Sequence, residues 1–185
     1  MIAVSLRFRT RWPVWQTDRP LPIDASPELE AWRLITDENL GRLFGSEPAR
    51  RETFAAFLRA GHVGIVREEA GRWIAYGWLA TPSSGPPDHL PDSASGRWWI
   101  FYCRTVEDRR GEGHYRRAVT RLVDEARVRA AEEVPVFIDT REDNLPARRA
   151  VERLGFSPRG VVTIYRIPRT SVRWAVWRRR QPHPA

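Results

Sequence analysis

Residues 110–115 read Arg-Gly-Glu-Gly-His-Tyr and place two glycines, Gly111 and Gly113, within a cluster of arginines. Residues 98–103 before them form an unbroken apolar and aromatic run, which predicts a buried strand. Over residues 115–130, apolar or small side chains recur every three or four positions, as on one stripe of an α-helix. A glycine turn between strand and helix points free backbone N–H groups at one spot, where the helix dipole adds roughly half a positive charge. The pattern predicts an anion site, most simply for a phosphate, although many Gly-x-Gly turns are only turns.

A second pattern follows another predicted strand at residues 134–140. Asn144 is followed by Ala147, and residues 152–156 read Glu-Arg-Leu-Gly-Phe. Together with the turn of Arg110, Gly113 and Tyr115, this order resembles the Gcn5-related N-acetyltransferase (GNAT) family. The turn of that family reads Arg-x-x-Gly-x-Gly/Ala, and its later segment reads Asn-x-x-Ala followed by Glu-Lys-x-Gly-Phe. The resemblance extends from residue 2 to about residue 178, nearly the whole chain.

The resemblance implies an acyl-CoA-dependent N-acyltransferase, most simply acetyl-CoA-dependent, that transfers the acyl group directly to an amine without a covalent enzyme intermediate. It implies that the turn holds the pyrophosphate and that the pantetheine arm lies where two parallel strands splay apart. No metal is expected. Asn144 can equally be the N-cap of the helix that follows it. The cofactor-binding residues implied in this way are Arg104, Thr105, Val106, Arg109, Arg110, Gly111, Glu112, Gly113, His114, Tyr115 and Asn144.

Three residues depart from the family's pattern. Tyr115 replaces a small residue, so its ring either packs beneath the turn or narrows the phosphate site. Glu112 puts a negative charge in an anion-binding turn. Val151 occupies the position at which many members carry the tyrosine that protonates the leaving thiolate. Tyr102, Tyr115 or Tyr165 is then an alternative acid, and each is equally a candidate core aromatic.

Acyl transfer to an amine also needs a group that removes a proton. Asp139, near the end of the strand beside the central one, is the candidate base with the best location, ahead of Glu107 and Asp108. A structural hydrogen-bonding role for Asp139 is the alternative. The candidate catalytic residues are therefore Asp139 and Tyr102.

Length and composition indicate a single globular domain over residues 1–180 with a frayed tail at 181–185. The net charge is +8, and all 31 basic residues are arginine, which binds phosphate and carboxylate groups with a planar fork. Such a surface suits an anionic cofactor, an acidic protein partner or nucleic acid, although a general replacement of lysine by arginine explains it equally well. The rival functions are a non-catalytic CoA-binding or partner-binding module, and acyl transfer involving an acidic carrier protein or tRNA.

The single cysteine, Cys103, allows no internal disulfide and fits a reducing compartment. No secretory signal and no apolar run of membrane-spanning length is present in the sequence, so a cytoplasmic protein without a membrane partner is expected. The acceptor is expected to be a small-molecule or protein amine. Both a monomer and a homodimer remain open.

The expected fold is α+β: a mixed, mostly antiparallel twisted sheet of about seven strands with a splayed parallel central pair, flanked by about four helices. Residues 11–16 are aromatic but interrupted by Pro13, and residues 17–22 are expected to be a loop. A long loop at 81–97 is expected to be disordered at its tip. Strands are predicted at 2–9, 62–67, 72–80, 98–103, 134–140, 161–167 and 171–180, and helices at 27–44 with a break near 37–38, at 47–61, at 115–130 and at 145–154.

Overall fold

The computed structural model describes residues 8–17, 21, 31–167, 170 and 173–180. The strands within these residues are β1 (Phe8–Thr17), β2 (Trp32–Ile35), β3 (Val63–Glu69), β4 (Arg72–Ala80), β5 (Trp98–Thr105), β6 (Val136–Asp139), β7 (Ser157–Arg166) and β8 (Arg173–Arg179). The helices are α1 (Asp37–Phe44), α2 (Pro48–Arg59), α3 (His114–Ala130) and α4 (Leu145–Arg153). Among the described residues, no helix combines the length and apolar character needed to cross a bilayer.

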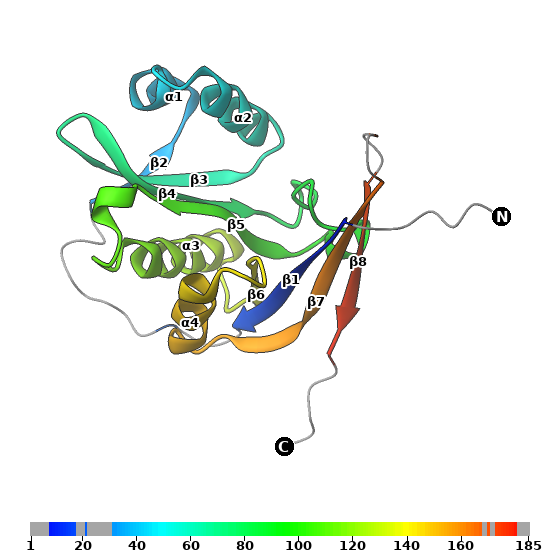
Figure 1. Cartoon of the computed structure of the whole chain (residues 1–185). Helices are drawn as coiled ribbons and strands as arrows, with labels where there is room; N and C mark the ends of the chain where they lie inside the picture. Colours follow the sequence, from blue (N-terminus) through cyan, green and yellow to red (C-terminus); the bar gives the residue numbers. More distant parts are fainter. Residues whose placement is uncertain (1–7, 18–20, 22–30, 168–169, 171–172, 181–185) are drawn as a thin grey trace.

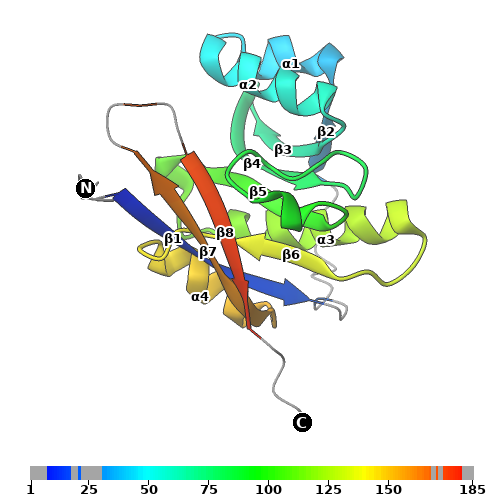
Figure 2. The same ribbon diagram turned by 90° about the vertical axis from the view of Figure 1, so that its right-hand side faces the viewer.

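All eight described strands form one sheet in the order β2-β3-β4-β5-β6-β1-β7-β8. Helices α1 and α2 lie on one side of the sheet, whereas α3 and α4 lie on the other (Figure 1). Figure 2 shows β8 at the outer edge and β6 beside β5 in the middle of the sheet. The predicted α+β architecture is therefore confirmed, with one strand more than expected.

Strands β5 and β6 run parallel and pair over a short distance, from Trp98 with Val136 to Ile100 with Ile138. Strand β5 then continues to Thr105, whereas β6 ends at Asp139. The rest of β5 consequently has no strand partner on its β6 side. This is the splayed parallel pair that the sequence led us to expect.

A β-bulge lies in the part of β5 beyond the paired residues. The register between β4 and β5 shifts, so that Tyr102 and Cys103 both lie opposite Gly77. Tyr102 adopts φ +51°, a left-handed conformation that costs a residue with a side chain on the order of 1–3 kcal/mol. The bulge turns the Tyr102 ring towards the aromatic cluster under α1 and α2, where it contacts Phe54, Phe57 and Tyr76.

Two hydrophobic cores lie on the two faces of the sheet. The core on the α3 face uses the predicted stripe of that helix, and the core on the other face is dominated by aromatic side chains beneath α1 and α2. The stripe is fully buried and consists of Ala118, Val119, Leu122, Val123 and Ala126. The spacing pattern therefore predicted this helix and its buried face correctly.

The prediction of a helix over residues 27–44 is wrong between Trp32 and Ile35, which form β2. Burial of Trp32 and Ile35 against the sheet, together with pairing to β3, outweighs the local helical pattern. The helix begins only at Asp37, where the Asn39 side chain accepts a hydrogen bond from the Thr36 N–H at 3.0 Å. The proposed start of the longer helix, at 27, lies outside the described residues.

The first strand is also displaced from its predicted position, and most of the predicted range 2–9 lies outside the described residues. Strand β1 runs through Pro13, although proline at this position predicts an interruption. The Pro13 carbonyl accepts a hydrogen bond from the Thr140 N–H. The N–H and C=O of one strand residue point to the same side, so the N–H that proline lacks would also have faced this side, just beyond the end of β6. Proline is tolerated because no ladder hydrogen bond is lost there.

The expectation of disorder at the tip of the 81–97 loop is wrong as well. The loop contains a short 3-10 turn (Asp92–Ala94) and buries Leu90 and Ala94 in the aromatic core. His89, from the same loop, reaches the side chain of Asp139 at 3.0 Å. The loop therefore packs onto the sheet at the end of β6.

Replacement of Gly77 by alanine is expected to destabilise the fold at the bulge. A Cβ at this position would lie 2.8 Å from Cys103 Sγ and 2.9 Å from Leu122 Cδ1, in a fully packed core. We expect Gly77→Ala to lower the free energy of unfolding by about 1–3 kcal/mol, measured by urea denaturation.

The matched control is Gly41→Ala in α1, where a Cβ meets nothing within 4 Å. Because alanine is the better helix former, this variant should gain about 0.5–1 kcal/mol. Equal stability of the two variants would contradict the packing described for Gly77.

Candidate active site

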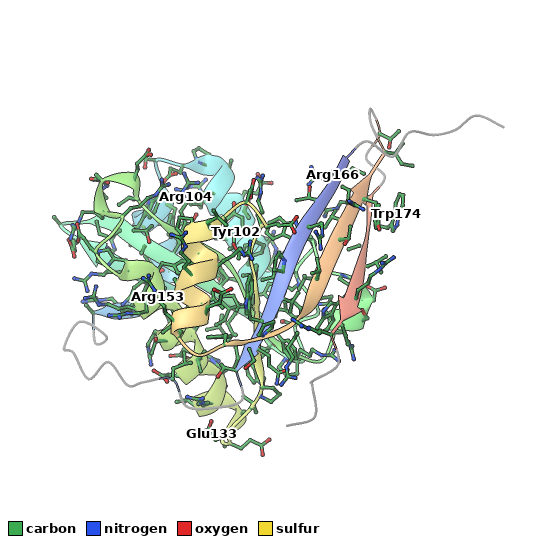
Figure 3. All side chains as sticks on the ribbon, turned by 60° about the horizontal axis from the view of Figure 1, so that its bottom comes forward. Tyr102, Arg104, Glu133, Arg153, Arg166 and Trp174 are labelled. Carbon is green, nitrogen blue, oxygen red and sulfur yellow. The ribbon has the colours of Figure 1, made fainter. Side chains whose placement is uncertain are left out.

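A pocket of about 1060 Å³ opens beside the unpaired part of β5, the glycine turn, the start of α3 and one face of α4. Arg153 is the last residue of α4, and Arg104 lies close to this helix (Figure 3). Arg166 and Trp174 lie away from α4, on the β7–β8 hairpin. Except for Val106, every residue implied to bind the cofactor lines this pocket: Arg104, Thr105, Arg109, Arg110, Gly111, Glu112, Gly113, His114, Tyr115 and Asn144. The structure thus brings together residues from β5, the turn and α4.

Val106 is the exception among the predicted cofactor residues. Its side chain is buried, and its N–H donates to the Ile74 carbonyl at 2.9 Å. This N–H is already satisfied within the protein and is not free to donate to a ligand, so the contact of Val106 with the cofactor stays a prediction.

The glycine turn leaves a row of backbone donors facing one place. Gly111 and Gly113 adopt φ +89° and +81°, which only glycine enters without strain, and Gly113 is the N-cap of α3. The backbone N–H groups of residues 111–115 donate no hydrogen bond to any described residue. Free donors at the positive end of a 17-residue helix have the geometry and the partial charge that an anion requires.

Arg109 is held by two carboxylates. Its Nε lies 2.8 Å from Glu112 Oε1, and its Nη1 lies 2.5 Å from Glu69 Oε2. Hydrogen bonds from Arg109 and from Arg67 lower the pKa of Glu69 to about 2. The hydrogen bond from Arg109 likewise lowers the pKa of Glu112. Arg109 therefore braces the turn, and its charge is largely neutralised by these acids.

The positive charge of the pocket wall comes mainly from other arginines. Arg104 on β5 and Arg153 on α4 form no ion pair with any residue that the structure describes. Arg110 has only a long contact, 3.4 Å, with the exposed Glu107. The wall therefore retains a positive potential despite the presence of Glu112 in the turn.

His114 and Tyr115 close the inner side of the turn. Burial lowers the pKa of His114, whose Nε2 lies 3.2 Å from Glu112 Oε2. The Tyr115 ring packs against the core beneath α3, and burial raises the pKa of its hydroxyl well above 10. Tyr115 thus packs against the core, as in the first of its two alternatives, and it also lines the pocket.

Three further residues that the sequence singled out, at α4 and on β7, make structural contacts. The Asn144 side-chain oxygen accepts from the Ala147 N–H at 3.3 Å and so caps the helix. Val151, at the position of the missing tyrosine, is 0% exposed within the core. Tyr165 stacks on Trp174 with the ring centroids 5.2 Å apart, on the β7–β8 hairpin. Neither Val151 nor Tyr165 lines the pocket.

The two candidate catalytic residues lie on the sheet face opposite the pocket's α3 wall. Tyr102 is 52% exposed at the bulge. The Asp139 side chain is only 1% exposed, with Oδ1 2.5 Å from Trp99 Nε1 and Oδ2 3.0 Å from His89 Nε2. Both Asp139 oxygens are engaged, so the predicted role of Asp139 as the direct proton acceptor remains a prediction that this geometry does not favour.

Several residues of the site escaped the sequence analysis. The α4 residues that line the pocket follow Asn144 at helical spacing, and this spacing is a signal from which they could be predicted. His89 carried no such signal, because it meets Asp139 across a separation of 50 residues. The additional pocket residues are Cys103, Arg116, Thr120, Pro146, Ala147, Ala150, Arg153 and Leu154.

Residues 28–156 match the model of the Acetyltransferase (GNAT) family, and the chain belongs to this family. No curated protein matches the chain. In the part of the chain that the structure describes, no three His, Cys, Asp or Glu side chains gather as metal ligands would.

Solved structures share the fold at low sequence identity. A GNAT-family protein from Novosphingobium aromaticivorans superposes with a TM-score of 0.61 at 15% identity, covering 85% of this chain and 63% of that one. A GNAT-family acetyltransferase from Colwellia psychrerythraea gives 0.56 at 14%, covering 82% and 54%. The aminoglycoside N-acetyltransferase AAC(6′)-Iy, in complex with CoA, gives 0.52 at 13%, covering 68% and 90%. The chain thus spans less than two thirds of the first two proteins.

Acid titration tests the ion pairs that brace the turn. The pKa of Glu69 is lowered from 4.5 to about 2 in the folded protein, so its stabilising contribution is complete above pH 4.5 and is lost as the pH falls towards 2. In Glu69→Gln, the urea midpoint should consequently fall less steeply with pH across this window than in the wild-type protein.

Glu52→Gln is the control, because Glu52 is exposed on α2 and pairs with no described residue. This variant should retain the wild-type slope. An unchanged slope in Glu69→Gln would show that the pairs with Arg109 and Arg67 do not persist in solution.

Proposed function

We propose that this protein transfers an acyl group, most simply acetyl, from acyl-CoA to an amine by direct transfer. The observation that carries the proposal is the row of free N–H groups at residues 111–115, which opens onto the pocket beside the splayed strands. Membership of the GNAT family supports the same reaction class.

The pocket residues fit the chemistry of coenzyme A. The turn's N–H groups and the α3 dipole suit the pyrophosphate, and Arg104, Arg110 and Arg153 supply further positive charge. Because the Asn144 oxygen caps α4, its amide nitrogen is the group left to donate to a pantetheine carbonyl. Thr105 Oγ1 has no hydrogen-bond partner among the described residues and is a second polar group in this wall.

The chain's only cysteine supports direct transfer over an acyl-enzyme. Cys103 lines the pocket, but burial raises the pKa of its thiol to about 12, so the nucleophilic thiolate is scarce near neutral pH. In direct transfer the amine nitrogen bonds to the carbonyl carbon while the carbon–sulfur bond breaks. Tyr102, exposed at the bulge, is our candidate donor of a proton to the departing thiolate, in place of the absent tyrosine at Val151.

The acceptor, small molecule or protein, is proposed to approach the splayed strands from the side of α1, α2 and the 81–97 loop, opposite the cofactor pocket. The arginines of the pocket wall suit the cofactor's phosphates, which leaves an acidic carrier or tRNA as a subsidiary proposal. A reducing, cytoplasmic location belongs to the same proposal, since a single cysteine forms no internal disulfide.

Gly113→Glu tests the cofactor site directly. The new carboxylate would stand where the pyrophosphate is proposed to bind, so the Kd for acetyl-CoA in calorimetry should rise at least about 100-fold, equivalent to about 2.7 kcal/mol. Gly85→Glu is the matched control: its φ is +72° against +81°, and it lies outside the pocket. A Cβ at Gly85 meets nothing within 4 Å, and a Cβ at Gly113 meets only Arg117, at ordinary contact distance (3.5 Å to Nη1).

Unchanged acetyl-CoA affinity in Gly113→Glu would overturn the proposed cofactor site. Release of CoA thiol with a panel of primary amines tests the reaction itself. Tight binding without amine-dependent release would identify the chain as a CoA-binding module instead.

A further inference from the structure

We propose that His89, held in place by Asp139, is the general base that removes the proton from the acceptor amine. This inference rests on the proposed function and assigns a catalytic role to the 81–97 loop. Asp139 becomes a positioning residue, acting through His89.

The hydrogen bonds orient the imidazole for this role. His89 Nε2 lies 3.0 Å from Asp139 Oδ2, and Asp139 Oδ1 is fixed by the Trp99 indole N–H at 2.5 Å. A carboxylate that accepts from Nε2–H selects the tautomer in which Nδ1 carries the free lone pair. His89 Nδ1 has no hydrogen-bond partner among the described residues, and it is therefore available to accept a proton.

Exposure separates the roles of the two residues. The Asp139 side chain is 1% exposed, so it cannot meet a substrate, whereas His89 is 23% exposed. A cavity of about 420 Å³ adjoins His89 between its loop and the β7–β8 hairpin, and its wall includes Asp88, Asp92, Arg173 and Trp174. An acceptor amine can approach the imidazole from this cavity.

The His89–Asp139 pair also lies close to the end of the short β5–β6 pairing, where the proposed acyl-CoA site begins. Asp139 is the last residue of β6, at the place where β5 continues without its partner. Burial raises the pKa of Cys103 and Tyr115, and the charge of Asp139 adds to both shifts. Since both residues line the acyl-CoA pocket, Asp139 lies within electrostatic range of that pocket from the opposite face.

The charges around His89 make it a stronger base than an isolated buried histidine. Burial by itself lowers the pKa of His89, but the charge and hydrogen bond of Asp139 more than offset this effect and raise it. Asp88, in the same loop, raises the pKa further, whereas Arg173 on β8 lowers it. The imidazole is neutral and able to accept a proton above this pKa.

The proposed step balances atoms and charge. The neutral Nδ1 takes one proton from the amine as the nitrogen's electron pair bonds to the thioester carbonyl carbon. The carbon–sulfur bond breaks, and its electron pair leaves with the CoA sulfur, which is protonated by Tyr102 or solvent. The imidazolium then returns its proton to water.

A purely structural role is the rival explanation. The His89 ring packs on Trp12 with the centroids 5.1 Å apart and ties the loop to the sheet. A structural role predicts lower stability in a variant without a change in the pH dependence of turnover, so the pH profile separates the two.

The test compares the wild-type protein with His89→Gln and Asp139→Asn. Thiol release from acetyl-CoA with a panel of primary amines is measured between about pH 5 and 9, a range that spans the ordinary histidine pKa. In the wild-type protein, kcat/KM should fall on the acid side as His89 becomes protonated. His89→Gln should lose this limb and be about 10²- to 10⁴-fold slower, with unchanged acetyl-CoA affinity.

Asp139→Asn should move the acid limb to lower pH, because the carboxylate that raises the His89 pKa is removed. The same shift should appear in the imidazole resonance of His89 by NMR, a readout that needs no acceptor. His62→Gln is the matched control: this histidine is tied to the same loop, with its Nδ1 2.9 Å from Ser84 Oγ, but does not touch Asp139. It should keep the wild-type limb.

A folded His89→Gln that retains the rate and the acid limb would overturn the role of His89. If that variant does not fold, a His89 resonance that does not move in Asp139→Asn overturns it instead. A wild-type protein that binds acetyl-CoA but releases no thiol with any amine would refute the proposed function, and the role of His89 with it.

Discussion

The separation of β5 and β6 is the constraint on which the candidate site depends. The two parallel strands pair over only three residues, after which β5 continues alone. Backbone groups in the middle of a sheet that lack a strand partner must be satisfied by water or by a ligand. The unpaired part of β5 therefore has backbone groups that a ligand could satisfy, and the pocket lies beside it. The bulge at Tyr102 lies within this stretch, where its strained conformation aims one side chain at the aromatic face.

The anion site is built chiefly from the backbone. Two positive-φ glycines and the start of α3 supply free donors at fixed positions, and these donors lose no side-chain entropy on binding. Arg109, a candidate phosphate ligand in the sequence, pairs with both Glu69 and Glu112. The acidic residue in the turn is thus neutralised by a neighbour and does not oppose an anion.

Under the proposed function, the sheet would separate the cofactor chemistry from the acceptor chemistry. The pocket lies on the face covered by α3 and α4, whereas the exposed Tyr102 and the His89–Asp139 pair lie on the face beneath α1, α2 and the 81–97 loop. Such a division would let the proposed phosphate-binding turn remain rigid while the acceptor face varies. Very low sequence identity to proteins of the same fold is compatible with this arrangement, because the glycine turn and the splayed strands constrain few side chains.

The sequence by itself determined the features that depend on neighbouring residues. The glycine turn and the buried stripe of α3 follow from local spacing and backbone preference, and both occur as predicted. The cap at Asn144 is one of the two roles that the sequence left open for this residue. Tertiary structure decided what depends on distant partners. Trp32 to Ile35 became a strand because β3 offered an edge, and Pro13 entered β1 because β6 ends beside it. The contact between His89 and Asp139 arises in the same way, since only folding of the loop onto β6 joins residues so far apart in the chain.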